Sequence, residues 1–129
     1  MRICGIDPGR ETGLVIFDTA LDDVTDFASC RSREDIVAFL AKGDCPVVVV
    51  EDFLGAGPRS ADAIFTLKLL GFLEGVCQVL FNCQVEFQPP QWRKAFLDKA
   101  QGFFRVHKER HMKDALAHVF SYIERMEVK

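Results

Sequence analysis

Two acidic residues stand at the ends of runs that have the composition of β-strands. Asp7 follows RICGI and precedes Pro-Gly, and Glu51 follows the β-branched run VVVV. If these strands are parallel neighbours, both carboxylates emerge at the carboxyl edge of one sheet, where open α/β sheets place their functional sites. Neighbouring carboxylates raise each other's pKa unless a cation lies between them, and Mg²⁺ is the hard, oxygen-binding ion that suits such a pair. The pattern therefore predicts a magnesium site.

A third acid, Asp114, lies near the end of the chain in the amphipathic segment HKERHMKDALAHVFSYIER. At about 100° per residue, the apolar residues of this segment fill one arc of a helix, and Asp114 shares a second, narrow arc with all the histidines of the protein. The histidines are His107, His111 and His118. We expect this second arc to lie over the strand ends that carry Asp7 and Glu51.

Each acid also has an ordinary structural explanation. Asp7 could simply form the turn before Pro-Gly, Glu51 could mark an exposed strand end, and Asp114 could be a solvated helical acid. The histidines could instead bind Zn²⁺, since histidines four residues apart on a helix can share an ion. Only convergence of the acids in space distinguishes a site from these alternatives.

The elements that must position these residues follow the order β-β-β-α-β-α-β-α-α. Strands are expected at 2–8, 12–18, 24–30, 46–52 and 83–87, and helices at 32–42, 60–81, 89–97 and 107–126. The first two strands form a hairpin, and the β-branched run at 46–52 indicates a strand covered on both faces. Ser32 is expected to cap the first helix, with Gly43 past its end. The fold class is therefore α/β, with a mixed five-stranded sheet flanked by helices in a single domain, 1–129.

Charge is distributed unevenly along the chain. Residues 1–58 contain 5 Lys and Arg against 11 Asp and Glu, whereas residues 88–113 contain 7 against 2. An acidic front half and a basic late segment suit a metal site beside a surface that contacts phosphates. The 5 cysteines form no CxxC pair, which favours buried thiols in a reducing cytoplasm. Lys68 and Glu74 interrupt the longest apolar stretch and argue against a membrane span.

Four segments resemble the RuvC-type Holliday-junction resolvases of the RNase H-like superfamily. CGIDPGRETGLVIFD resembles the first hairpin of that family, and VVVVEDF the strand that carries its glutamate. LKLLGFLEG resembles the helix that follows, and HMKDALAHV the last catalytic helix. The motifs occur in the family's order over nearly the whole chain, whose length is closest to the compact members from bacteriophages.

This resemblance implies that Asp7, Glu51 and Asp114 are catalytic carboxylates that bind Mg²⁺, with two ions per site and Mn²⁺ able to substitute. His111 falls where the family has a further acid or a histidine, so it is a candidate catalytic residue and metal ligand. The implied activity is structure-selective cleavage of four-way or branched DNA by paired nicks that leave 5′-phosphate ends, in the cytoplasm of a bacterial or infected host cell. Two alternatives share the fold: a YqgF-like nuclease that acts on RNA, and a non-catalytic nucleic-acid-binding module.

The resemblance also implies two contact surfaces, one for DNA and one for a second copy of the chain. The helix at 60–81 is apolar nearly all round, so it is either fully buried in one domain or shared with a partner in a homodimer. Its expected interface residues are Phe65, Leu69, Gly71, Phe72 and Gly75. The expected DNA contacts are Phe53, Arg59, Arg93, Lys94, Lys99, Arg105, Lys108, Arg110 and Lys113.

Overall fold

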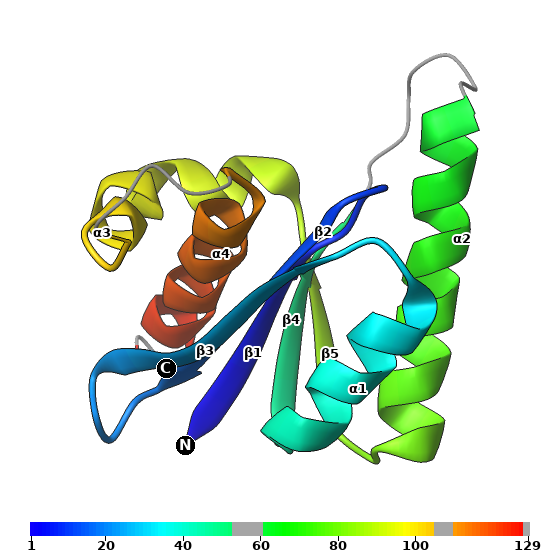
Figure 1. Cartoon of the computed structure of the whole chain (residues 1–129). Helices are drawn as coiled ribbons and strands as arrows, with labels where there is room; N and C mark the ends of the chain where they lie inside the picture. Colours follow the sequence, from blue (N-terminus) through cyan, green and yellow to red (C-terminus); the bar gives the residue numbers. More distant parts are fainter. Residues whose placement is uncertain (53–60, 105–109, 128–129) are drawn as a thin grey trace.

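A computed structural model describes residues 1–52, 61–104 and 110–127 of the chain. The strands are β1 (Arg2–Asp7), β2 (Thr12–Asp18), β3 (Asp23–Cys30), β4 (Val47–Glu51) and β5 (Gln84–Gln88). The helices are α1 (Arg33–Gly43), α2 (Ala61–Gly75), the π-helical turn η1 (Val76–Leu80), the 3₁₀ turn η2 (Pro90–Phe96), α3 (Leu97–Gln101) and α4 (Arg110–Glu127). The strands form one sheet in the order β3-β2-β1-β4-β5 (Figure 1).

The pairing of these strands is mixed, as the sequence predicts. β1 pairs antiparallel with β2 and parallel with β4, and β4 pairs parallel with β5. Val47, Val48, Val49 and Val50 of β4 are all buried, because helices cover both faces of the sheet. The predicted α/β class and the mixed five-stranded sheet are therefore confirmed, with β1 and β4 as parallel neighbours.

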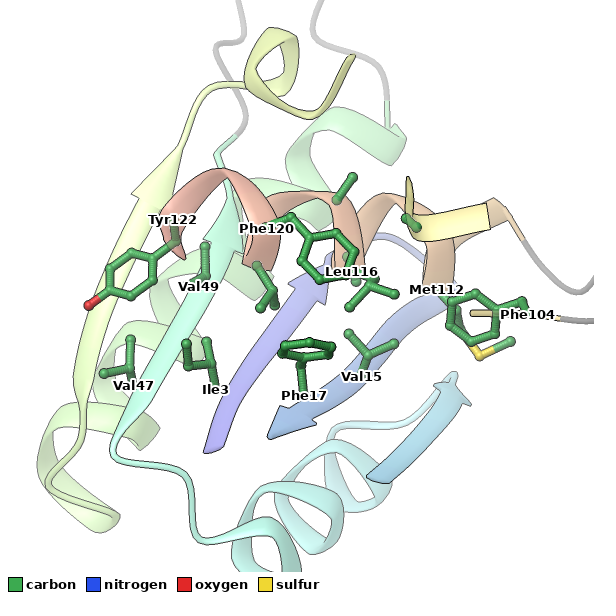
Figure 2. Close-up of a cluster of buried hydrophobic side chains, with 14 residues drawn as sticks. Ile3, Val15, Phe17, Val47, Val49, Phe104, Met112, Leu116, Phe120 and Tyr122 are labelled. Carbon is green, nitrogen blue, oxygen red and sulfur yellow. The ribbon is translucent and has the colours of Figure 1, made fainter. Parts of the chain in front are cut away.

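Two hydrophobic cores lie on opposite faces of the sheet, and alternate strand residues supply them. Ile3, Val15 and Phe17 face α3 and α4, whereas Cys4, Leu14 and Ile16 face α1 and α2. Figure 2 shows the first core, in which Phe17 lies beneath Phe120 of α4 with 5.1 Å between the ring centroids. The sheet is therefore the rigid layer on which both helical layers rest.

The ends of α1 confirm the predicted capping, with one difference. Ser32 accepts a hydrogen bond from the Asp35 backbone N–H at 3.1 Å, as an N-cap residue does. Gly43 is the last helical residue, and Asp44 takes the left-handed conformation with φ 48°. Asp tolerates that conformation better than most residues, so the helix ends here without a glycine at the left-handed position.

The long apolar helix α2 presents different residues to its own sheet and to solvent. Leu69, Leu70 and Leu73 are buried against the second core, and Phe65 and Phe72 pack partly against it. Leu69 is only 2% exposed within the chain. The prediction that Leu69 contributes to a partner interface is therefore wrong.

The outer face of α2 is also apolar. Ile64 and Leu67 of α2, and Val79 of the following turn η1, are exposed large hydrophobic residues, and a Cβ atom at Gly71 or Gly75 would meet nothing within 4 Å. By length and composition alone, Ala61–Leu80 could also cross a membrane, with a mean hydropathy of 1.6. Packing of its inner residues on the sheet accounts for only part of that apolar character.

Helix α4 approaches β1 and β2 closely because two strand positions beneath it are glycines. A Cβ atom at Gly5 would lie 2.4 Å from the carbonyl oxygen of Ala115, and one at Gly13 would lie 2.5 Å from the backbone of His111. Protein interiors are close-packed, so a larger residue at either place would displace the helix. The two glycines therefore set the height of α4 above the sheet.

We predict that Gly5→Ala destabilises the protein by about 1–3 kcal/mol, the usual effect of overpacking a core. The free energy of unfolding, measured by urea denaturation, checks this. Gly102→Ala is the matched control, because a Cβ there would lie 3.4 Å from its nearest neighbour, the Lys99 carbonyl oxygen. Equal stability of the two variants would contradict the close approach of α4.

Candidate metal and catalytic site

Three acids from three different elements gather at the carboxyl edge of the sheet. Asp7 ends β1 and Glu51 ends the neighbouring parallel strand β4, whose register pairs Ile6 with Val50. Asp114 lies near the beginning of α4, which rests on both strands. Asp7 and Asp114 are buried, at 5% and 7% exposure, and Glu51 is half-buried. This is the convergence that the sequence predicts.

Burial and mutual repulsion perturb these acids strongly. Burial, together with the negative charge of Glu51, raises the pKa of Asp7 from 3.8 to about 7. Burial also raises the pKa of Asp114, against the opposing charge of Arg93. Burial alone would raise the pKa of Glu51 too, but the hydrogen bond from His118 and the charge of Arg93 outweigh it and lower the pKa. Such perturbation is common where carboxylates are held for catalysis or metal binding.

His111 contacts the acid cluster directly. Its Nδ1 lies 2.9 Å from Oδ2 of Asp7, and its side chain is 43% exposed. An ionised Asp7 makes Nδ1 the protonated nitrogen of a neutral ring, which leaves Nε2 as the acceptor. The contact supports the expectation that His111 belongs to this site.

Arg93 lies inside the acid cluster. The sequence places it on a DNA-contacting surface, whereas in the structure its guanidinium pairs with Glu51 and also lies 3.6 Å from Asp114 Oδ1. η2, which carries Arg93, packs against α4 and so delivers the cation between the two carboxylates. The arginine balances part of the negative charge that the three acids concentrate.

Two further polar residues, His118 and Gln88, form the inner wall of the site. Nε2 of His118 lies 2.9 Å from Oε1 of Glu51, and Nδ1 lies 2.9 Å from the side-chain amide of Gln88. His118 shares the predicted arc with Asp114, and the only role that the sequence analysis considers for it is Zn²⁺ binding; no role was predicted for Gln88. The only feature of the sequence that could have indicated Gln88 is its place as a polar residue at the end of a strand, where β5 pairs Gln88 with Glu51.

The donor atoms of the cluster suit a hard divalent cation. Carboxylate oxygens are the preferred ligands of Mg²⁺, and burial, followed by the negative charge of Glu51, raises the pKa of Asp7. Within the described parts of the chain, no three His, Cys, Asp or Glu side chains already stand in metal-binding positions. In the structure, Arg93 supplies part of the positive charge beside the acids. The carboxylate oxygens of the three acids, and the burial of these residues, suit a divalent cation.

The remaining predicted DNA contacts are spread over two ends of the molecule. Arg110 is exposed, and its Nε lies 4.0 Å from Oδ2 of Asp114. The half-buried Lys113 precedes Asp114 on α4. Lys94 is exposed on η2 beside Arg93. The ammonium of Lys99 lies 4.4 Å from the ring of Phe120.

Lys99 is separated from the acid cluster. It lines a hollow with Asp22, Glu124 and Glu127, at the opposite end of α4 from Asp114. Four other predicted contacts, and one of the histidines on the predicted arc, lie outside the described residues. These are Phe53, Arg59, Arg105, Lys108 and His107.

Solved structures share this fold over nearly the full chain, although no protein-family model and no curated protein matches the sequence. Thermus thermophilus RuvC in complex with Holliday junction substrate aligns with a TM-score of 0.77 at 15% identity, over 99% of this chain and 96% of that chain. A second Thermus thermophilus RuvC structure gives 0.77 at 17% identity, over 98% and 97% of the chains.

Fowlpox virus resolvase, in complex with substrate Holliday junction DNA, aligns with a TM-score of 0.70 at 16% identity, over 95% of this chain and 99% of that chain. The chain therefore has the RNase H-like fold of RuvC and the poxvirus resolvase. The resemblance that the sequence motifs predict is confirmed at the level of the fold.

The raised pKa of Asp7 predicts that this residue destabilises the protein at alkaline pH in the absence of metal. Its pKa is higher in the folded chain than the ordinary 3.8, so its contribution to stability is complete below about pH 4 and is lost as pH rises through about 7. Asp7→Asn cannot ionise and should be more stable than the wild type at pH 8 in EDTA, by about 1–4 kcal/mol. The advantage should shrink towards pH 4.

Glu51→Gln is the control of opposite sign. Because the pKa of Glu51 is lowered, its ionised form adds stability above its unfolded pKa, and the amide variant should gain nothing at pH 8. Urea denaturation in EDTA at pH 5 and pH 8 measures both variants. A stability difference for Asp7→Asn that does not change with pH would contradict the assigned pKa.

Proposed function

We propose that the protein is a divalent-cation-dependent endonuclease that resolves four-way DNA junctions. The observation that carries this proposal is the convergence of Asp7, Glu51 and Asp114 at the carboxyl edge of an RNase H-like sheet. The fold is shared with RuvC and the Fowlpox virus resolvase, both of which were solved with Holliday junction DNA. These likenesses support the choice of branched DNA as the substrate.

The three carboxylates would hold the metal, each from a rigid element. A divalent cation, when bound, polarises a phosphate and lowers the pKa of its water. Asp7 and Glu51 are fixed by their strands, and Asp114 by the helix that Gly5 and Gly13 allow to approach. Metal sites that leave room for substrate need such preorganised ligands.

The nitrogen donors around the acids would handle protons and phosphate. Asp7 binds Nδ1 of His111, so Nε2 of the half-exposed ring can accept a proton or contact a phosphate oxygen. The guanidinium of Arg93 has a fork of donors that bind carboxylate and phosphate alike. It can therefore exchange Glu51 or Asp114 for the DNA backbone. Arg110 and Lys113, beside Asp114 on α4, would extend the phosphate contacts.

We predict Mg²⁺-dependent paired nicks on a labelled synthetic four-way junction, with 5′-phosphate ends, and none on a matched linear duplex. EDTA should abolish cleavage. Asp7→Asn should lower the rate by more than the roughly 100-fold that loss of an outer-shell partner can cost. Asp98→Asn, at an exposed acid of α3, is the control and should cleave like the wild type.

Other outcomes of this assay would assign other functions. Cleavage of an RNA–DNA hybrid in place of the junction would transfer the protein to RNA processing. Junction binding without cleavage would leave a recognition module of the same fold. Normal cleavage by Asp7→Asn would contradict the assigned site.

The exposed face of α2 supports a homodimer as the active form. Ile64 and Leu67 are exposed there, and Gly71 and Gly75 permit close helix approach. Exposed apolar faces of this kind mark association surfaces, and a twofold dimer would place two sites on symmetry-related strands of a junction.

We predict that Leu67→Glu converts the dimer into monomers, because a charge in an apolar twofold contact is buried twice. Light scattering after gel filtration measures the mass. Leu21→Glu is the control, since Leu21 is an exposed leucine in the turn between β2 and β3, and this turn lies on the opposite side of the molecule from α2 (Figure 1). A wild-type monomer at micromolar concentration, or dissociation by Leu21→Glu, would contradict this interface.

A further inference from the structure

A chain of buried and half-buried polar side chains runs from the candidate metal site into the protein. Glu51 contacts His118, His118 contacts Gln88, and the amide of Gln88 lies against Arg125. His118 and Gln88 are 0% exposed. Buried polar groups are costly unless they are hydrogen-bonded, so a fully buried histidine and glutamine behind one carboxylate require an explanation.

Arg125 determines the orientation of the Gln88 amide. Arginine can only donate, and its Nη2 lies 2.7 Å from one end of the amide, so that end is the oxygen. The amide nitrogen then donates to Nδ1 of His118 at 2.9 Å and to the His118 carbonyl oxygen at 3.2 Å. All the donors of the amide, and its oxygen, are used in this orientation, whereas the reverse would set two donors against each other.

The amide in turn determines the tautomer of His118. Because Nδ1 accepts a hydrogen bond from Gln88, the proton of the neutral ring must lie on Nε2. Nε2–H then donates to Oε1 of Glu51 at 2.9 Å. Every bond in the chain therefore points the same way, from Arg125 through the amide and the imidazole to the carboxylate.

Arg125 is itself held in place by aromatic rings. Its guanidinium lies 4.4 Å from the ring centroid of Trp92 and 6.0 Å from that of Tyr122, within the range of cation–π attraction. Its Nε is buried without a hydrogen-bond partner among the described residues. The arginine is thus placed for its Nη2 contact and its ring packing at the expense of another donor.

These contacts determine how the Glu51 carboxylate is held. Within the described residues, its contacts with His118 and with Arg93 both reach Oε1, so the carboxylate is held by one oxygen while Oε2 remains for a cation. Glu51 ends β4, and its half-buried side chain is held there by Arg93 and His118 together. Outer-shell partners that orient a ligating carboxylate typically contribute 10–100-fold to metal affinity.

We infer that His118 is a positioning residue: Gln88 and Arg125 hold it in the Nε2–H tautomer, and it fixes Glu51 with one oxygen presented to the divalent cation. This inference rests on the proposed function, because it assumes that Glu51 binds metal. It assigns the chain from Arg125 to His118 a role that packing alone would not require.

Two variants of His118 test the donor itself. In His118→Gln the side-chain amide nitrogen reaches about as far as Nε2, so the bond to Glu51 is kept. In His118→Asn the side chain reaches only as far as Nδ1, so that bond is lost. Mn²⁺ affinity, measured by isothermal titration calorimetry on the full chain, should stay near the wild-type value in His118→Gln and fall by about 10–100-fold in His118→Asn. Thermal unfolding of both variants in EDTA separates this from loss of the fold.

Equal Mn²⁺ affinity of the two variants, or a fall that follows only their thermal stability, would overturn the inference. Asp7→Asn is measured beside them. If the wild type binds no Mn²⁺, or Asp7→Asn binds it as well as the wild type, the proposed metal site fails. If Asp7→Asn loses binding while His118→Asn does not, only the positioning role fails.

A second measurement requires no metal. Long-range ¹H–¹⁵N spectra report which ring nitrogen of His118 carries the proton. We expect the proton on Nε2 in the wild type, because Nδ1 accepts from Gln88 and Nε2 donates to Glu51. A proton on Nδ1 in the wild type would overturn the inference.

Discussion

The close approach of α4 to β1 and β2 is the constraint on which the candidate site depends. Gly5 and Gly13 leave no side chain between the helix and the sheet, so the backbone of His111 rests directly on the strand beside Asp7. Because protein interiors are close-packed and transmit small displacements, the height of one helix determines the distances between acids on three elements. Packing and chemistry are therefore coupled at the same two positions.

The site concentrates negative charge in a place that water reaches poorly. Asp7, Glu51 and Asp114 would repel one another strongly there, and the structure distributes the compensation unequally. Arg93 and His118 stabilise the charge of Glu51, whereas Asp7 retains a pKa of about 7. The acids thus have different affinities for protons although they share one sheet edge, and a cation would relieve the repulsion that remains.

The two faces of the sheet serve different purposes. One face packs against α3 and α4, and α4 carries His111 and Asp114 of the candidate site. The other face packs against α1 and α2. The outer surface of α2 adds an apolar face on the side away from the sheet. The proposed nucleic-acid surface and the proposed subunit contact would therefore lie on opposite sides of the sheet.

The sequence by itself determined the order of the strands along the chain, the α/β class and the three acids, because strand composition, helical periodicity and the motif order are local properties. It did not determine that Leu69 faces inward, since a helix that is apolar all round has no unique inner face. It also did not determine that Lys99 lies far from the site, since a count of charged residues does not show where each side chain lies in the fold. Only the tertiary structure brought Arg93 between two carboxylates and joined Gln88 and Arg125 to His118. Those contacts link residues distant in the chain, and they follow from how β5, η2 and α4 pack together, which no local pattern encodes.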